Sequence, residues 1–141
     1  MEGIIAVGKM AGKQVPAINK NRIPNATYCE PQIGSMGLSE KQARDAGIAV
    51  KVGKFPFVGN SKATILGSHE GFIKVVADEK YGEVLGVHII GPLATEVIAE
   101  AVAAMQLEAT VDDMMFAVHA HPTVSEVIRM ACADAAAKCG C

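Results

Sequence analysis

The sequence has no tryptophan, and aromatic residues make up only 4% of the chain. An interior must therefore be built from aliphatic side chains and methionine, and half of the residues are hydrophobic. No apolar run approaches the ~20 residues that a membrane-spanning helix needs. The N-terminus lacks the basic segment and long apolar stretch of a signal peptide. We therefore expect a cytoplasmic protein without a membrane partner.

Strong charge of either sign is also missing. The net charge is −2, and neither a basic stripe nor a set of aromatic side chains for stacking bases is present. Nucleic acid is therefore not an expected partner. At 141 residues, without internal repeats or low-complexity segments, the chain has the size of one domain. Such a domain buries about two thirds of the surface that its unfolded chain exposes.

The four cysteines do not have the spacing of a disulfide framework. Cys29 stands alone, whereas Cys132, Cys139 and Cys141 crowd the C-terminus. Free thiols are therefore the expectation in a cytoplasmic protein. Cys139 and Cys141 have the alternative of binding a soft metal or exchanging disulfides, but a frayed tail with incidental thiols is the simpler interpretation.

The pattern of apolar residues predicts strands first and helices later. A period of two indicates extended segments, of which a hairpin joined by residues 78–82 is the clearest. A period near 3.6 begins after Gly91 and Pro92 and predicts a helix with one apolar stripe. The residues of this stripe are Leu93, Val97, Ile98, Ala101, Val102 and Met105. The expected strands are 26–29, 33–38, 48–57, 71–77 and 84–90. The expected helices are 3–12, 40–46, 93–105, a short one after Thr110, and 125–138, with a polar loop or irregular helical turn at 59–67.

Three positions have the signature of a helix start. Ser39 with Gln42 three residues later forms a capping box, Thr110 precedes acidic residues in a first turn, and Ser125 precedes an alanine-rich segment. Strands and helices are segregated along the chain, which indicates an α+β fold. We expect an antiparallel sheet of about five strands with helices packed on one face. The other face is expected to be wet or to meet a partner.

The most informative segment is residues 119–126, His-Ala-His-Pro-Thr-Val-Ser-Glu. Pro122 keeps His121 out of the helical region, so this imidazole is expected on extended chain just before a helix. Glu126 falls in the first turn of that helix, where the helix dipole favours an ionised carboxylate. From there it can reach the His121 ring, fix its tautomer and leave the second ring nitrogen for proton transfer.

Simpler interpretations of the same residues stay open. Glu126 can be an ordinary acid at a helix start, and His121 an ordinary turn residue. His119 and His121 can project to one side as metal ligands, but no third ligand follows at suitable spacing, so no metal site is predicted. Of the other histidines, His69 is expected in solvent and His88 is expected to be a hydrogen-bonded histidine of the core.

The octapeptide closely resembles the C-terminal signature of the dihydrolipoamide dehydrogenases, which belong to the pyridine nucleotide-disulfide oxidoreductase family. Residues 1–20 then look like the tail of a preceding flavin domain and a connector, and residues 21–141 look like the dimerisation domain. Further segments resemble the same family in the same order, and together they cover nearly the whole chain. These segments are 23–24, 36–40, 71–74, 85–91 and 94–96.

The resemblance also implies roles for single residues. His121 would be the acid/base for the thiols of dihydrolipoamide in the partner subunit's active site, and Glu126 would orient its ring. The backbone of His121 and Pro122 would lie near the partner's flavin. The implied enzyme is an NAD-dependent dihydrolipoyl dehydrogenase that also uses FAD. Its implied partners are a second copy of the chain and the lipoyl-bearing acyltransferase component of a 2-oxoacid dehydrogenase complex.

Two parts of such an enzyme are missing from this sequence. No Gly-x-Gly-x-x-Gly follows a strand, and no two cysteines have the family's spacing for the redox-active pair. The chain alone is therefore expected to bind neither FAD nor NAD and to be inactive. We interpret it as an excised domain or a natural fragment of the longer enzyme.

Two other functions stay open. A stand-alone dimerisation or docking module would keep the fold and perform no chemistry. The same domain of a glutathione or mercuric reductase is the second alternative, because glutathione reductases share the His-Pro-Thr-x-Ser-Glu core and mercuric reductases have paired C-terminal cysteines. His119 and Ala120, which precede that core here, favour the lipoamide branch.

Overall fold

The computed structural model describes residues 1–138, so the alternatives for Cys139 and Cys141 lie outside the described residues. Its centre is a five-stranded antiparallel sheet with the strand order β1-β2-β5-β4-β3. The prediction of an α+β fold is confirmed, and the strand ends differ from the predicted ends by no more than two residues. The strands are β1 Asn25–Thr27, β2 Gln32–Gly37, β3 Val50–Pro56, β4 Phe72–Asp78 and β5 Val84–Gly91.

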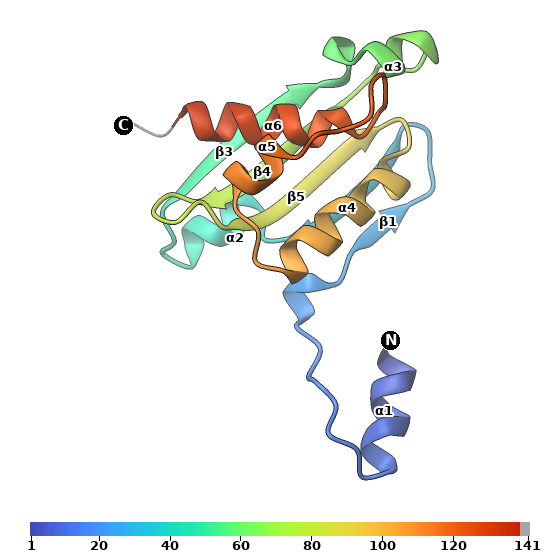
Figure 1. The fold of residues 1–141 in the computed structure, drawn as a ribbon, viewed down its shortest axis with the longest axis vertical. Coiled ribbons are helices and arrows are strands. Elements are labelled where there is room, and N and C mark those ends of the chain that lie inside the picture. Colours follow the sequence, from blue (N-terminus) through green and yellow to red (C-terminus); the bar gives the residue numbers. More distant parts are fainter. Residues whose placement is uncertain (139–141) are drawn as a thin grey trace.

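Three helices cover one face of the sheet (Figure 1). α4 Ala94–Gln106 packs on β2 and β5, and α6 Glu126–Ala137 packs on β3 and β4. α5 Val111–Phe116 lies against α6. Their apolar side chains and the facing side chains of the strands form the main hydrophobic core. Within residues 1–138, no helix is long and apolar enough to cross a membrane.

The opposite face of the sheet is partly covered by α2 Glu40–Asp45. Its Ala43 packs with Val50 and Val76 in a second, smaller cluster. Val76 points away from the main core because side chains alternate along a strand, and its neighbour Val75 points into that core. The capping box predicted at Ser39 and Gln42 starts this helix. The prediction that helices pack on one face of the sheet is therefore correct for α4, α5 and α6. α2 lies on the opposite face, where no helix was predicted.

The long helix corrects one residue of the predicted apolar stripe. Val97, Ile98, Ala101 and Met105 are buried, as expected. Leu93 is instead 44% exposed and has a left-handed backbone with φ 55°. It occupies the N-cap position, where the chain turns from the end of β5 into α4, so it lies outside the helical stripe.

The N-terminal segment stands apart from the sheet (Figure 1). α1 Glu2–Met10 has no buried residue, and Ile4 and Met10 are 70% and 80% exposed. A connector with the short 3-10 helix η1 Lys20–Arg22 leads to β1. Arg22 at its end contacts the Glu108 carboxylate at 3.2 Å. The division into residues 1–20 and 21–141 stays a prediction.

The link between β3 and β4 forms the irregular helical turn expected there. It consists of the 3-10 helix η2 Phe57–Gly59 and the short helix α3 Ser61–Ile65. Asn60 lies between them and is only 4% exposed. This residue caps α3, because its side-chain oxygen accepts a hydrogen bond from the Ala63 N–H at 2.8 Å.

α6 approaches the sheet closely at Gly53 of β3. A Cβ atom at this position would lie 1.9 Å from the Ala131 carbonyl oxygen and 2.6 Å from the Ala135 nitrogen. Only glycine therefore lets the helix backbone rest on the strand. Asp134 of α6 also accepts the Lys54 N–H at 2.8 Å, and Lys138 donates to the Val52 carbonyl at 3.0 Å. These contacts attach α6 to β3, which is an edge strand of the sheet.

We predict that Gly53→Ala lowers the free energy of unfolding by about 1–3 kcal/mol, because the added methyl group overpacks the contact between α6 and β3. Chemical denaturation measures the change. Gly3→Ala is the control, since a Cβ at Gly3 meets nothing within 4 Å. Equal stability of the two variants would contradict the proposed close approach.

Candidate active site

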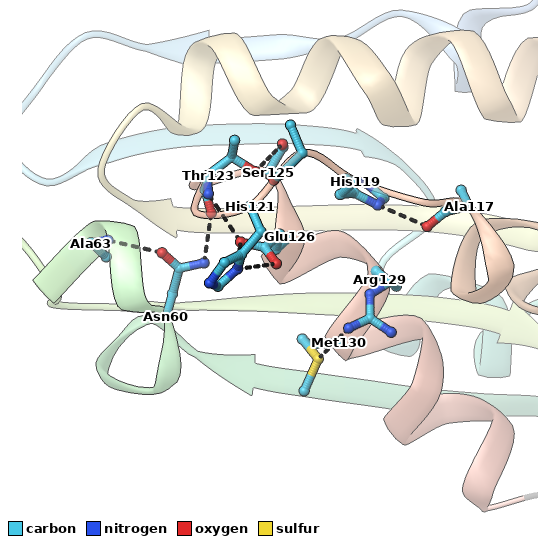
Figure 2. Close-up of polar contacts among 11 residues, drawn as sticks. Asn60, Ala63, Ala117, His119, His121, Thr123, Ser125, Glu126, Arg129 and Met130 are labelled. Carbon is cyan, nitrogen blue, oxygen red and sulfur yellow. Dashed lines mark hydrogen bonds and ion pairs between the residues drawn. The ribbon is translucent and has the colours of Figure 1, made fainter. Parts of the chain in front are cut away.

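The predicted pair His121 and Glu126 lies on the loop between α5 and α6 and on the first turn of α6 (Figure 2). The His121 Nδ1 atom is 3.0 Å from Glu126 Oε1 and 3.2 Å from Oε2. The side chain of His121 is 68% exposed, whereas that of Glu126 is 18% exposed. The imidazole therefore reaches into solvent while its carboxylate partner is held against the protein.

The Glu126 carboxylate is also bound by the loop backbone. The Thr123 N–H donates to Glu126 Oε2 at 2.9 Å. This hydrogen bond, and after it the one from His121, hold the pKa of the Glu126 carboxyl below its ordinary value of 4.5. An ionised carboxylate accepts hydrogen bonds, so the proton of a neutral His121 ring belongs on Nδ1. The exposed Nε2 then carries the lone pair that can accept a proton.

Thr123 forms hydrogen bonds both within the loop and with residues outside it. Besides its N–H, its hydroxyl donates to the Ala120 carbonyl at 2.7 Å and lies 3.1 Å from the Ser125 hydroxyl. Its carbonyl accepts a hydrogen bond from Asn60 at 3.0 Å. The loop around His121 is therefore hydrogen-bonded on several sides, although its surface is open to solvent.

The prediction that the Ser125 side chain caps α6 is wrong. Ser125 occupies the N-cap position, but its side chain makes no capping hydrogen bond and its backbone is already helical, with φ −62° and ψ −21°. The contact expected of a helix start is made instead between the Thr123 N–H and the Glu126 side chain. Thr-x-x-Glu is the spacing of a capping box, so the sequence did contain a signal for Thr123.

His119 has a different environment from His121. Its side chain is only 9% exposed, and its Nε2 lies 2.8 Å from the Glu100 carboxylate of α4. Its Nδ1 lies 3.1 Å from the Ala117 carbonyl. Both ring nitrogens of His119 thus face oxygen atoms of the protein. His119 ties the start of the loop to α4 and has no ring nitrogen open to solvent for a substrate.

No metal site is formed by the part of the chain that the structure describes, since no three His, Cys, Asp or Glu side chains gather there. His88 is hydrogen-bonded, as expected, through its Nε2 to the Leu38 carbonyl at 3.1 Å, but it is half-buried outside the core. His69 is exposed. Burial raises the pKa of the Cys132 thiol to about 12, with a smaller contribution from the Glu100 charge, so this cysteine is not a nucleophile.

A groove of about 340 Å³ adjoins the loop on the side of α4. The His121–Pro122 peptide bond is cis, and Pro122 contributes to the groove wall. The remaining wall comes from α3, from the start of α4 and from the loop. The lining residues are Lys62, Leu93, Glu96, Val97, Pro122, Thr123, Val124 and Ser125.

Fold and loop together define a known class of domain. Residues 23–132 match the family model described as "Pyridine nucleotide-disulphide oxidoreductase, dimerisation domain", so the chain belongs to this family. It is similar to a dihydrolipoyl dehydrogenase of Rhizobium etli, with 44% identity over 95% of this chain. It is also similar to the mitochondrial dihydrolipoyl dehydrogenase of Caenorhabditis elegans, with 46% identity over 99% of this chain. In both cases the chain spans 28% of the relative's length.

Solved structures share the fold. The crystal structure of LpdA from Mycobacterium tuberculosis has a TM-score of 0.87 at 24% identity, and covers 94% of this chain and 29% of its own. The HOCl-induced flavoprotein disulfide reductase RclA from Escherichia coli has a TM-score of 0.84 at 21% identity, over 92% of this chain and 30% of its own. The family model and the two dihydrolipoyl dehydrogenase relatives confirm the predicted resemblance to the dihydrolipoamide dehydrogenases and their dimerisation domain.

The lowered pKa of Glu126 predicts a pH-dependent contribution to stability. Folding favours the carboxylate, so the contribution is complete above the ordinary pKa of 4.5 and is lost as the pH falls through the lower folded value. We expect wild type to be more stable than Glu126→Gln near neutral pH and the difference to shrink in acid. Denaturation of both proteins across this range measures it.

The control for this experiment is Glu2→Gln, a helix-start glutamate of α1, where no residue is buried. The free energy of unfolding of Glu2→Gln should follow that of wild type across the pH range, because no residue of α1 is buried. All other carboxylates are common to the compared proteins, so their titration cancels. A difference between wild type and Glu126→Gln that stays constant in acid would show that Glu126 is not held as described.

Proposed function

We propose that this domain supplies the acid–base pair His121 and Glu126 to the active site of a partner subunit in an NAD-dependent dihydrolipoyl dehydrogenase. The observation that supports this proposal most is that His121 is exposed to solvent, whereas Glu126 is held against the protein. His121 presents an exposed Nε2, while its Nδ1 is bound by a carboxylate that the loop backbone holds ionised. This is the arrangement of a general base with an orienting partner.

The chemistry asked of the pair is proton transfer to and from sulfur. A thiolate is the nucleophile in thiol–disulfide exchange, whereas a neutral thiol reacts poorly. His121 Nε2 would take the proton from a thiol of dihydrolipoamide, leaving the electron pair of the S–H bond on sulfur. Glu126 stabilises the resulting imidazolium through Nδ1, and the imidazolium returns the proton to a leaving thiolate later in the reaction.

The cofactors of such an enzyme would be bound outside this chain. Flavin and nicotinamide supply the electron transfer in the family, but no Gly-x-Gly-x-x-Gly is present here to cradle a dinucleotide phosphate. The relatives are about three and a half times as long as the matched segment, which leaves room for these sites elsewhere. The His121–Pro122 backbone would then face the partner's flavin, and this chain alone would bind neither FAD nor NAD.

The proposed partners follow from the same assignment. A dimerisation domain associates with a second copy, and exposed apolar side chains at Leu107, Phe116 and Val118 are available for such a contact. The lipoyl-bearing acyltransferase component of a 2-oxoacid dehydrogenase complex is the proposed carrier of the substrate. A cytoplasmic location is part of this proposal.

The kinetic test uses a full-length enzyme that joins this chain to flavin- and nucleotide-binding domains. His121→Gln should retain flavin and dimerisation and slow dihydrolipoamide oxidation by ~10²–10⁴, the usual value of acid–base help. Glu126→Gln should slow it less, because the base remains and only its charged partner is lost. Turnover per bound flavin is the quantity to compare.

His119→Gln is the matched control in the same loop. It removes the contact with Glu100 but leaves the exposed base, so its effect on turnover should be milder than that of His121→Gln. Abolished turnover in His119→Gln with normal turnover in His121→Gln would mean that the wrong histidine is assigned. If neither variant slows the reaction, the pair is structural and the domain is a dimerisation module without chemistry.

Self-association has its own test in the isolated chain. We expect a two-fold dimer at high protein concentration in analytical ultracentrifugation, weakened by Val118→Asp because Val118 is 98% exposed and a charge would be buried at the contact. Val118→Thr, with nearly the same shape, should associate almost as wild type does. A strict monomer at the highest concentration would contradict the prediction.

A further inference from the structure

Asn60 is a polar residue for which the proposed function has no role. Within residues 1–138 it is the one polar or charged residue that is buried. Figure 2 shows its side chain between α3 and the loop that carries His121. Buried polar groups are costly unless their hydrogen bonds are complete, so the partners of Asn60 indicate what the residue does.

The amide of Asn60 uses both of its ends. Oδ1 accepts from the Ala63 N–H at 2.8 Å, and Nδ2 donates to the Thr123 carbonyl at 3.0 Å. A backbone N–H only donates and a carbonyl only accepts, so one orientation of the amide satisfies both. Aspartate, serine or threonine would cap α3 as well, but none of them offers this second N–H arm. Capping of α3 alone therefore does not explain why residue 60 is an asparagine.

The second arm reaches the residue that holds the carboxylate. Thr123 receives the Asn60 hydrogen bond at its carbonyl and donates its own N–H to Glu126 Oε2. Glu126 in turn accepts from His121 Nδ1. A continuous path of hydrogen bonds thus runs from α3 through Thr123 and Glu126 to the His121 ring.

We propose that Asn60 is a positioning residue for His121. By holding Thr123 it keeps Glu126 on the Nδ1 side of the ring, so that the neutral imidazole carries its proton on Nδ1 and presents Nε2 as the base. The effect on catalysis rests on the proposed function, whereas the effect on the tautomer does not.

The test reads the tautomer of His121 directly in the 141-residue chain. Long-range ¹H–¹⁵N NMR at alkaline pH, where histidine rings are neutral, distinguishes Nδ1–H from Nε2–H. Wild type should have the Nδ1–H form in the majority. In Asn60→Ser and Asn60→Asp, which keep a capping oxygen but lose the N–H arm, the majority should change to the Nε2–H form that a free imidazole prefers in water.

Thr64→Ala is the matched control. The Thr64 hydroxyl donates to the Asn60 carbonyl at 3.2 Å, so its loss weakens α3 but leaves the Asn60 amide in place. This variant should keep the wild-type tautomer. Agreement of the serine and aspartate variants excludes the lost volume and the added charge as causes.

Three outcomes would overturn the proposal. They are a wild-type tautomer in both Asn60 variants, an equal change in Thr64→Ala, and unfolding of both Asn60 variants in backbone amide spectra, which would make Asn60 a residue of the fold only. In the full-length enzyme, Asn60→Ser should lower turnover less than His121→Gln and shift the pH profile. A changed tautomer with unchanged turnover would support the positioning by Asn60 and overturn the acid–base role of His121.

Discussion

The position of the site depends on the packing of α6 against β3. Gly53 lets the helix backbone approach within contact of the strand, and the Asp134 and Lys138 side chains bind the backbone of the same strand. One side of α6 is thereby buried from Val127 to Ala135. Glu126 directly precedes the buried Val127, so the packing of α6 also fixes the position of the Glu126 carboxylate. The loop before it has to adapt to that position.

The two histidines of the octapeptide differ in their environment: one anchors the loop to the domain and the other is exposed to solvent. They are two residues apart, yet His119 is turned inward to Glu100 and His121 outward to solvent. An anchored ring with both nitrogens occupied holds the loop against α4, and an exposed ring with one free nitrogen has the properties that proton transfer requires. Cys132, the other group with reactive chemistry near Glu100, is made inert by burial. Of His119, His121 and Cys132, only the His121 side chain is therefore largely exposed to solvent.

Hydrogen bonds to the backbone organise this site more than charge does. The Thr123 N–H is the largest cause of the lowered pKa of Glu126, ahead of His121 itself. The Thr123 carbonyl and hydroxyl are bound as well, by Asn60 and to Ala120. A carboxylate held in this way keeps its place whether or not the imidazole is protonated. That property suits a pair whose proposed reaction changes the charge of the histidine in every cycle.

Local sequence patterns were enough to predict the order of strands and helices, the capping box of α2, the Thr110 cap of α5 and the contact between His121 and Glu126, because each depends on residues close together in the chain. The prediction failed at the start of α6, where the Ser125 side chain makes no capping hydrogen bond and the Thr123 N–H binds the Glu126 side chain instead. The contacts of Asn60 with Thr123 and of Glu100 with His119 could not be predicted from the sequence, because they form only in the folded chain. Asn60 and Thr123 are 63 residues apart in the chain, and Glu100 and His119 are 19 residues apart. Each pair meets only when α3 and α4 have packed beside the loop, and no local sequence pattern encodes that packing.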